Sequence, residues 1–193
     1  MASIYLVQDM INDLIHPDGP NGKQGSGPEA ARRNVVPNTA KALEKARKAG
    51  IKVGFVRVGF SPDYKECPPN SPVFSRAREN GIFQLGTWGT EVHADLKPRD
   101  DEFDIVKHRV SPFYGTSLEP VLRANGITRI YCSGVSTNGV VHACVREGHD
   151  RDYEIVVLED CCSAGSPEEH DMSLKVFTRF CKEITTADQV QFS

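Results

Sequence analysis

The sequence predicts an α/β fold, a three-layer α/β/α sandwich around a parallel, Rossmann-like sheet. Short apolar runs of strand length alternate along the chain with segments of helical periodicity, which is typical of βαβ units. The sequence contains no internal repeat, and its 193 residues suit one domain with one buried core, so we expect residues 1–193 to form a single domain. Because helices separate the strands, right-handed crossovers would give a parallel sheet covered on both faces.

The apolar runs place the elements in order along the chain. Strands are expected at residues 4–7, 51–58, 104–106, 129–135, 154–158 and, at an edge of the sheet, 183–186. Helices are expected at residues 36–47, 118–122, 137–147 and 167–177. Gly50 and Gly126 follow two of these helices as stop signals, and Pro167 suits the first turn of the last.

Two longer segments show no regular periodicity. Residues 16–27 are rich in Gly and Pro and are expected to form a loop. The connection at residues 59–89 is unusually long for a compact domain, and such segments usually serve function. We expect it to form a lid or one wall of a pocket.

Composition argues against several classes of function. The formal net charge is -3 and no basic stripe occurs, so no nucleic-acid partner is expected. The apolar runs are too short to cross a bilayer, and the amino-terminal residues lack the basic region of a signal peptide, so a cytoplasmic protein without a membrane partner is expected. The six cysteines form no C-x-x-C pair, and no metal site or other cofactor is expected.

Two charged residues stand directly after predicted strands. In a parallel sheet the ligand crevice lies beyond the carboxyl ends of the strands, where Asp9 and Lys107 fall. A partly desolvated Asp9 could exchange a proton near neutral pH, or it could simply cap loop amides. Lys107 could keep that aspartate ionised or stabilise negative charge on a substrate, or it could belong to a solvated basic cluster with His108 and Arg109.

A third feature is the turn Gly134-Val135-Ser136-Thr137-Asn138, which joins a predicted strand to a helix. Backbone N–H groups of such a turn suit an oxyanion or a carboxylate, and glycine permits close approach. Such turns are common in this architecture. The shared position of the three features at one edge of the sheet is what indicates a small-molecule site.

Together these residues resemble the isochorismatase-like superfamily, which includes cysteine hydrolases such as nicotinamidases and carbamoylsarcosine-type amidases. The resemblance extends over almost the whole chain. Its motifs are, in order, Leu6-Val7-Gln8-Asp9-Met10-Ile11-Asn12-Asp13, Asn38 in the first long helix, Gly86-Thr87-Trp88-Gly89-Thr90, the segment 106–116, the turn at 134–138 and Glu159-Asp160-Cys161-Cys162-Ser163-Ala164.

The resemblance implies a strand order of 3-2-1-4-5-6 and a homodimer or homotetramer. In that order Lys107 would lie two strands from Asp9, roughly 10 Å away at about 4.8 Å per strand. The lysine side chain would therefore have to lean inward for the two to meet. The resemblance also implies that this aspartate and lysine work with a cysteine three residues after the threonine of the turn.

That third position is Val140, which offers neither a nucleophile nor a proton. Cys144 lies about 6 Å further along the same helix face, away from the helix dipole that would lower the pKa of its thiol. The isochorismatase branch of the superfamily also lacks the cysteine and is implied to cleave a vinyl ether, with the aspartate as general acid and water as nucleophile. The sequence resembles this branch in the segment 168–175 as well.

Further residues are candidates for binding substrate. The resemblance implies a substrate-binding glutamine after the second strand of that branch, but residues 55–60 contain none. Arg57 in this stretch would bind an anionic substrate if it faces the crevice. The remaining candidates come from the segment after Lys107 and from the turn, and are Phe113, Tyr114, Ser136, Thr137, Gly139 and Val140. No Asp-x-His motif follows the second strand, so no metal site is expected there.

Three hypotheses follow. The preferred one is a hydrolase of a small anionic metabolite, with Asp9 as general acid or base, Lys107 as electrostatic partner and no covalent cysteine intermediate. The second is a non-catalytic relative that binds a small molecule or a protein. The third is an amidase-type cysteine hydrolase that uses Cys144.

Overall fold

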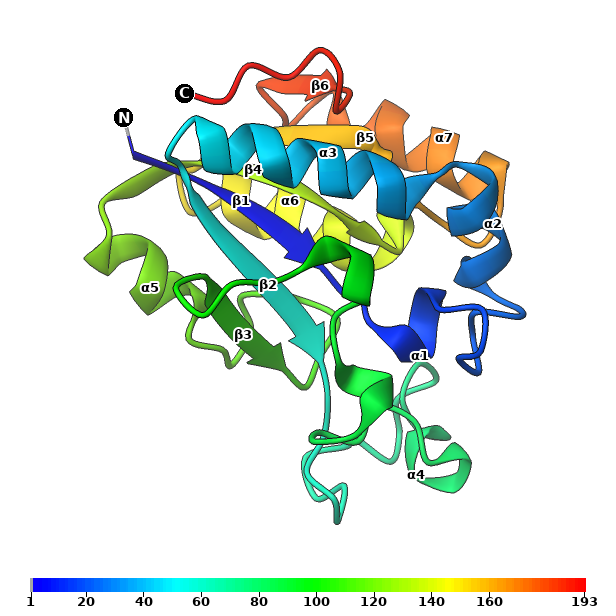
Figure 1. The fold of residues 1–193 in the computed structure, drawn as a ribbon. Coiled ribbons are helices and arrows are strands. Elements are labelled where there is room, and N and C mark those ends of the chain that lie inside the picture. Colours follow the sequence, from blue (N-terminus) through cyan, green and yellow to red (C-terminus); the bar gives the residue numbers. More distant parts are fainter. Residues whose placement is uncertain (1) are drawn as a thin grey trace.

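The predicted parallel sheet is present. The computed structural model describes residues 2–193, and all six of its strands form one sheet in the order β3-β2-β1-β4-β5-β6 with parallel pairing throughout (Figure 1). The strands are β1 (Ala2–Gln8), β2 (Lys52–Val58), β3 (Phe103–Lys107), β4 (Ile127–Val135), β5 (Glu154–Ser163) and β6 (Glu183–Thr185). The fold class, the strand order and the position of β6 at an edge are therefore confirmed.

Helices cover both faces of the sheet (Figure 1). The longer helices are α3 (Val35–Lys48), α5 (Leu118–Ala124), α6 (His142–His149) and α7 (Pro167–Phe177), and the shorter ones are α1 (Asn12–Ile15), α2 (Ser26–Arg32) and α4 (Ala77–Asn80). On one face, α3 packs Leu43 and Ala46 against Tyr5 and Phe55 of the strands. On the other, α5, α6 and α7 bury apolar side chains against β1, β4 and β5. Alternate side chains of each strand enter the two cores, as the period of a β-strand requires.

Several elements differ from the prediction. Residues 26 and 27 belong to α2 rather than to a loop, and α1, α2 and α4 are too short for periodicity to reveal. The helix expected from residue 137 begins as a π-helical turn, η3 (Thr137–Val141), before α6. Strand β5 continues past residue 158 to Ser163 because, after an irregularity in register, it pairs again with the end of β4. Its polar pair Glu159-Asp160 concealed that continuation in the sequence.

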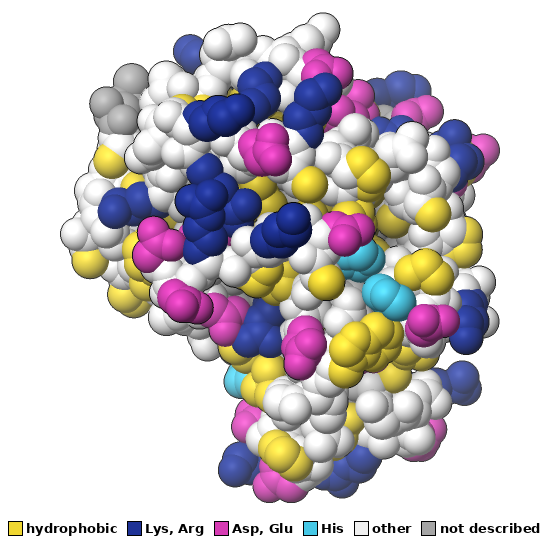
Figure 2. All heavy atoms as spheres, viewed as in Figure 1, with side chains coloured by type: hydrophobic (Ala, Val, Ile, Leu, Met, Phe, Trp, Pro, Cys, Tyr) yellow, Lys and Arg dark blue, Asp and Glu magenta, His cyan; other side chains and the backbone are white. Residues whose placement is uncertain are grey.

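Residues 59–89 form a lobe beyond the carboxyl ends of β1 and β2, and this lobe includes α4 (Figure 1). It has an apolar core of its own, in which Phe60, Phe74 and Phe83 pack against Ile11 and Val58. Figure 2 shows the lobe projecting from the body of the molecule, and it shows Lys and Arg side chains gathered over α3 with Asp and Glu among them. Within residues 2–193, no helix combines the length and the apolar character needed to span a membrane.

Candidate functional site

Asp9 and Lys107 meet above the end of β2. Asp9 follows β1, and its backbone N–H donates to the carbonyl of Val56 at 2.7 Å. Its Oδ1 accepts the Val58 N–H at 2.8 Å, so the carboxylate lies over the intervening strand. Lys107, the last residue of β3, leans inward until its Nζ lies 2.9 Å from Asp9 Oδ2, and it also donates to the Arg109 carbonyl at 3.0 Å.

Burial sets the electrostatics of this pair. Asp9 is 4% exposed and Lys107 is 2% exposed. Desolvation raises the pKa of Asp9, while its ion pair and hydrogen bond with Lys107 and the Val58 N–H oppose that rise. A carboxyl group in such surroundings exchanges protons more readily near neutral pH than a solvated one. The arrangement therefore suits acid–base chemistry.

A cavity of about 610 Å³ opens on the pair. The two charged residues are buried, whereas Pro72, Val73 and Arg76 at the other end are exposed and form its mouth. Its lining is largely apolar, with scattered polar groups, and consists of Asp9, Leu14, Asn21, Gly25, Ser26, Val58, Pro72, Val73, Phe74, Arg76, Ala77, Asn80, Ile82, Phe83, Lys107, Val110, Val135, Ser136, Asn138, Gly139, Val140, Gly165 and Glu169. The lobe at residues 59–89 thus supplies one wall.

The turn after β4 supplies another part of the lining. Ser136, Asn138, Gly139 and Val140 all line the cavity. Thr137 does not, and instead its hydroxyl lies 2.8 Å from Nδ1 of His170 on α7. A Cβ on Gly139 would come within 2.6 Å of Ser136 Oγ, so the turn has no room for a larger residue unless that hydroxyl moves. Of the four predicted binding residues in this turn, Ser136, Gly139 and Val140 therefore line the cavity and Thr137 does not.

Arg57 lies outside the cavity. Its guanidinium forms an ion pair with Asp104 on β3, at 2.6 to 2.7 Å, and donates to the Thr90 carbonyl. The alternation of side chains along β2 explains this position, because Val58 faces the cavity and its neighbour must face the other side of the sheet. Arg57 is thus not among the residues that could touch a ligand in this cavity.

Two aromatic candidates also lie elsewhere. Phe113 is buried in the core, where it stacks on Tyr153 at 6.2 Å between ring centroids. Tyr114 is 67% exposed and does not line the cavity. Both follow Lys107 in sequence, but the chain has by then turned away from the sheet edge.

The sequence did not single out the residues at the mouth. Arg76 and Asn80 come from the lobe, Asn21 and Ser26 from the loop before α2 and its first residue, and Glu169 from the first turn of α7. The length of the segment 59–89 did indicate a pocket wall. Which of its side chains face inward depends on the packing of its apolar core against Ile11 and Val58.

No cysteine lines this cavity among residues 2–193. Cys132, Cys144, Cys161 and Cys162 are all fully buried. Desolvation raises the pKa of the Cys162 thiol to about 12, and Cys144 and burial raise that of Cys132 well above its usual value. The Cys132 and Cys162 thiols are therefore protonated at neutral pH. In the same part of the chain, no group of three or more His, Cys, Asp or Glu side chains is placed to hold a metal ion.

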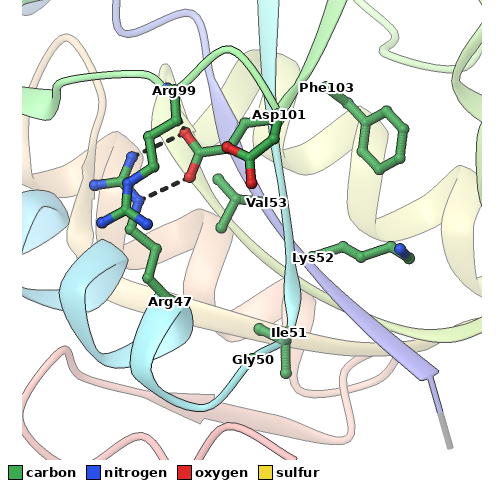
Figure 3. Close-up of a pocket in the computed structure, with 9 residues that line it drawn as sticks. Arg47, Gly50, Ile51, Lys52, Val53, Arg99, Asp101 and Phe103 are labelled. Atoms are coloured by element: carbon green, nitrogen blue, oxygen red, sulfur yellow. Dashed lines mark hydrogen bonds and ion pairs between the residues drawn. The ribbon is translucent and has the colours of Figure 1, made fainter.

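A second cavity, of about 280 Å³, lies at the opposite ends of the strands (Figure 3). Its residues come from the end of α3 and from the starts of β2 and β3. Figure 3 shows Arg47 facing acidic side chains there, and Arg47 Nε lies 2.7 Å from Glu102 Oε1. Because Arg47 already pairs with Glu102 and ligands of parallel sheets bind at the carboxyl ends of the strands, this cavity is not the candidate site.

Comparisons with known proteins identify the family. The chain is 31% identical over 192 residues to ureidoacrylate amidohydrolase RutB of Methylorubrum extorquens (strain AM1), covering 93% of this chain and 77% of that one. It is 35% identical over 151 residues to the isochorismatase family protein YecD of Escherichia coli O157:H7, covering 77% and 76% of the two chains. Among solved structures, N-carbamoylsarcosine amidase from Thermoplasma acidophilum superposes with a TM-score of 0.78 at 28% identity, covering 100% of both chains. The isochorismatase domain matches residues 3–189, and the protein therefore belongs to the isochorismatase family of hydrolases.

Proposed function

We propose that this protein hydrolyses a small anionic molecule, with Asp9 as general acid and base, Lys107 as its electrostatic partner, and water rather than a cysteine as the nucleophile. The observation that carries the proposal is the buried Asp9–Lys107 pair at the closed end of a cavity that no cysteine lines. The charge of each partner would otherwise be costly to bury, so the pair suits a site where protons are transferred.

The proposed reaction has two proton transfers, both through Asp9. Protonated Asp9 donates its proton to the leaving atom of the substrate as that bond breaks. A water molecule adds its oxygen to the electrophilic carbon, and its proton returns to the Asp9 carboxylate. Lys107 stabilises the carboxylate between these two steps, and N–H groups of the turn at 136–140 are available to negative charge on the substrate.

Val140 supports a route without a covalent intermediate. Its side chain lines the cavity at the position where the resemblance places a cysteine, and it carries no nucleophilic atom. Cys144, the residue of the third hypothesis, is fully buried in the core between α6 and the sheet. A thiol there could reach a substrate only after the helix had moved.

The mouth of the cavity favours an anionic substrate. Arg76 lines it, and among residues 2–193 its side chain forms no ion pair or hydrogen bond. Arg57, in contrast, is already neutralised by Asp104. A carboxylate on the outer end of a substrate would therefore bind Arg76 while the reacting end lies against Asp9. The relatives named for ureidoacrylate and N-carbamoylsarcosine suggest ureido acids as substrates, since both names describe a carboxylate joined to a ureide.

The test is turnover of a panel of ureido acids, amides and vinyl-ether carboxylates by the wild-type protein and by two variants. Asp9→Asn should abolish turnover while retaining the fold, and Cys144→Ala should retain turnover. The opposite pattern would reject the proposal in favour of a cysteine hydrolase. Unfolding temperatures of both variants, measured first, show whether each is folded.

A non-catalytic relative is the second candidate, and Val140 in place of a nucleophile is the observation that favours it. Such a protein would be stabilised against unfolding by a ligand of the same panel without converting it. Turnover of any member of the panel, lost in Asp9→Asn, would eliminate this alternative.

A further inference from the structure

We propose that His170 is a positioning residue. It accepts a hydrogen bond from Thr137 and thereby fixes the turn at residues 136–140, which walls the cavity. Nδ1 of His170 lies 2.8 Å from Thr137 Oγ1, and both side chains are buried, at 1% and 0% exposure. Thr137 is the member of this turn that faces away from the cavity, so its hydroxyl is the point at which the turn is held from behind.

The surroundings of His170 Nε2 determine whether Thr137 or His170 donates the hydrogen bond between them. Nε2 of His170 lies 3.5 Å from Glu159 Oε2 and has no hydrogen-bond partner among residues 2–193. His170 and Arg33 lower the pKa of Glu159, so this carboxylate is ionised at neutral pH. A carboxylate favours a proton on the nitrogen that faces it. His170 therefore carries its hydrogen on Nε2, and Nδ1 accepts from the Thr137 hydroxyl.

The contacts continue into two further elements. Arg33, which directly follows α2, donates from Nη2 to Glu159 Oε2 at 2.6 Å and to the Glu159 carbonyl at 3.1 Å, and from Nε to the Cys162 carbonyl at 2.9 Å. The turn is thus connected through His170 on α7 to Glu159 on β5 and then to Arg33. We call Thr137, His170, Glu159 and Arg33 the backing network. Thr137 and His170 are buried, and Arg33 and Glu159 are partly exposed. Polar contacts between packed side chains restrict their geometry, which a wall of backbone donors requires.

A histidine that only fills space would need neither a particular tautomer nor a particular acceptor atom. The backing network requires both. The tautomer can be measured directly in the wild-type protein, by long-range proton–nitrogen correlation spectroscopy of the His170 ring with selective labelling. Hydrogen on Nε2 is the expected result, and hydrogen on Nδ1 would overturn the proposal. This measurement needs no substrate and does not depend on the proposed function.

Two substitutions separate the two sides of the ring. In His170→Asn a terminal oxygen lies the same number of bonds from Cβ as Nδ1 and can accept from Thr137. In His170→Gln the terminal amide lies where Nε2 was and keeps only the contact with Glu159. A positioning role predicts that His170→Gln impairs the turn much more than His170→Asn, whereas a space-filling role predicts equal effects.

The turn can be monitored without a natural substrate by placing a thiol on it. In a Val140→Cys background the rate of alkylation by iodoacetamide reports the surroundings of that thiol. We expect His170→Gln to change this rate several-fold and His170→Asn to leave it close to the background value. Asp171→Asn, at an exposed neighbour on α7, is the matched control and should leave the rate unchanged. Equal rates in the Gln and Asn variants would overturn the proposal.

Turnover provides the second readout, and only this part rests on the proposed function. Displacing the turn should lower kcat about 10- to 100-fold in His170→Gln, because small misplacements in a site cost rates of that order. Thr137→Val should have the same effect, and the double variant should be no worse than either single one, since both remove one contact. Additive losses in the double variant would contradict a shared contact. Absence of turnover in the wild type, with the alkylation pattern as expected, would count against the proposed function alone.

Discussion

Lys107 Nζ lies 2.9 Å from Asp9 Oδ2 although the strands that carry the two residues are separated by β2. Two features bring the side chains together across β2. Asp9 lies over the end of β2, where its N–H donates a hydrogen bond to the Val56 carbonyl and its carboxylate accepts one from the Val58 N–H. The long side chain of Lys107 leans inward over the same strand. The pair depends on both features, so its energetics can be examined from either partner.

Replacing Lys107 with Met should shift the pH dependence of catalysis upward. Lys107 lowers the pKa of Asp9 against the effect of burial, so its loss raises that pKa further. If protonated Asp9 starts the reaction, the acid form persists to higher pH, and the alkaline fall of kcat/KM moves to higher pH. The rate itself should fall by about 100-fold with the loss of an electrostatic partner. Lys107→Arg keeps the positive charge and should shift the alkaline fall of kcat/KM less. If Lys107→Met does not shift this fall, a group other than Asp9 titrates in the pH profile.

Val140→Cys should create one fast-reacting thiol in a protein whose own cysteines react slowly. The new side chain would line the cavity that Lys107 also lines, whereas no native cysteine among residues 2–193 lines it, and burial raises the pKa of Cys162 to about 12. Mass spectrometry after brief alkylation would show the label at position 140. Val141→Cys is the matched control, because Val141 is fully buried in the core and its thiol should react slowly. Equal labelling of the two variants would show that a thiol at position 140 is no more accessible than one at the buried position 141.

Arg76→Ala should raise KM for an anionic substrate about 10-fold or more with little change in kcat, as expected for the loss of a charged hydrogen-bonding partner at the outer end of the substrate. The effect should vanish for an uncharged analogue. Arg78→Ala provides the control, since Arg78 is an exposed neighbour that donates to the Asp63 carbonyl and does not line the cavity. Arg57→Ala, which breaks the ion pair with Asp104, should likewise leave KM unchanged. A larger effect from Arg57 than from Arg76 would reverse the assignment.

Gly89→Ala should loosen the wall of the cavity and destabilise the protein by about 1–3 kcal/mol, the usual cost of overpacking. A Cβ at this position would lie 2.3 Å from Oδ1 of Asp13, whose Oδ2 accepts the Phe83 N–H at 2.7 Å. Asp13→Ala alone also destabilises, because it removes that acceptor. The double variant should lose less stability than the sum of the single variants, since the clash requires the carboxylate. Denaturant unfolding measures the free energy of unfolding of the two single variants and the double variant. Strictly additive losses would show that the new Cβ does not clash with the Asp13 carboxylate.

Much of the fold could be predicted because its causes are local. Apolar runs of strand length and helical repeats are properties of neighbouring residues, and they identified six strands and the four longer helices. The parallel arrangement then required the residues just after the strands, among them Asp9 and Lys107, to share one edge. The continuation of β5 to Ser163 was not predictable, because it depends on pairing with β4 across a register irregularity. The π-helical turn before α6 was not predicted either.

The candidate site also has features that the sequence could predict and features that depend on tertiary contacts. The sequence by itself determined which chemical groups reach the carboxyl edge: a carboxyl group, an amine and a turn that contains Val140. Only the tertiary structure decided which of them touch. Arg57 forms an ion pair with Asp104, which is distant in sequence, and the alternation of side chains along β2 directs Arg57 away from the cavity. The lobe at residues 59–89 places Arg76 at the mouth of the cavity. The physical reason is that a side chain's type is encoded at one position, whereas its burial, its partner and the pKa of a group such as Asp9 depend on residues that folding brings next to it.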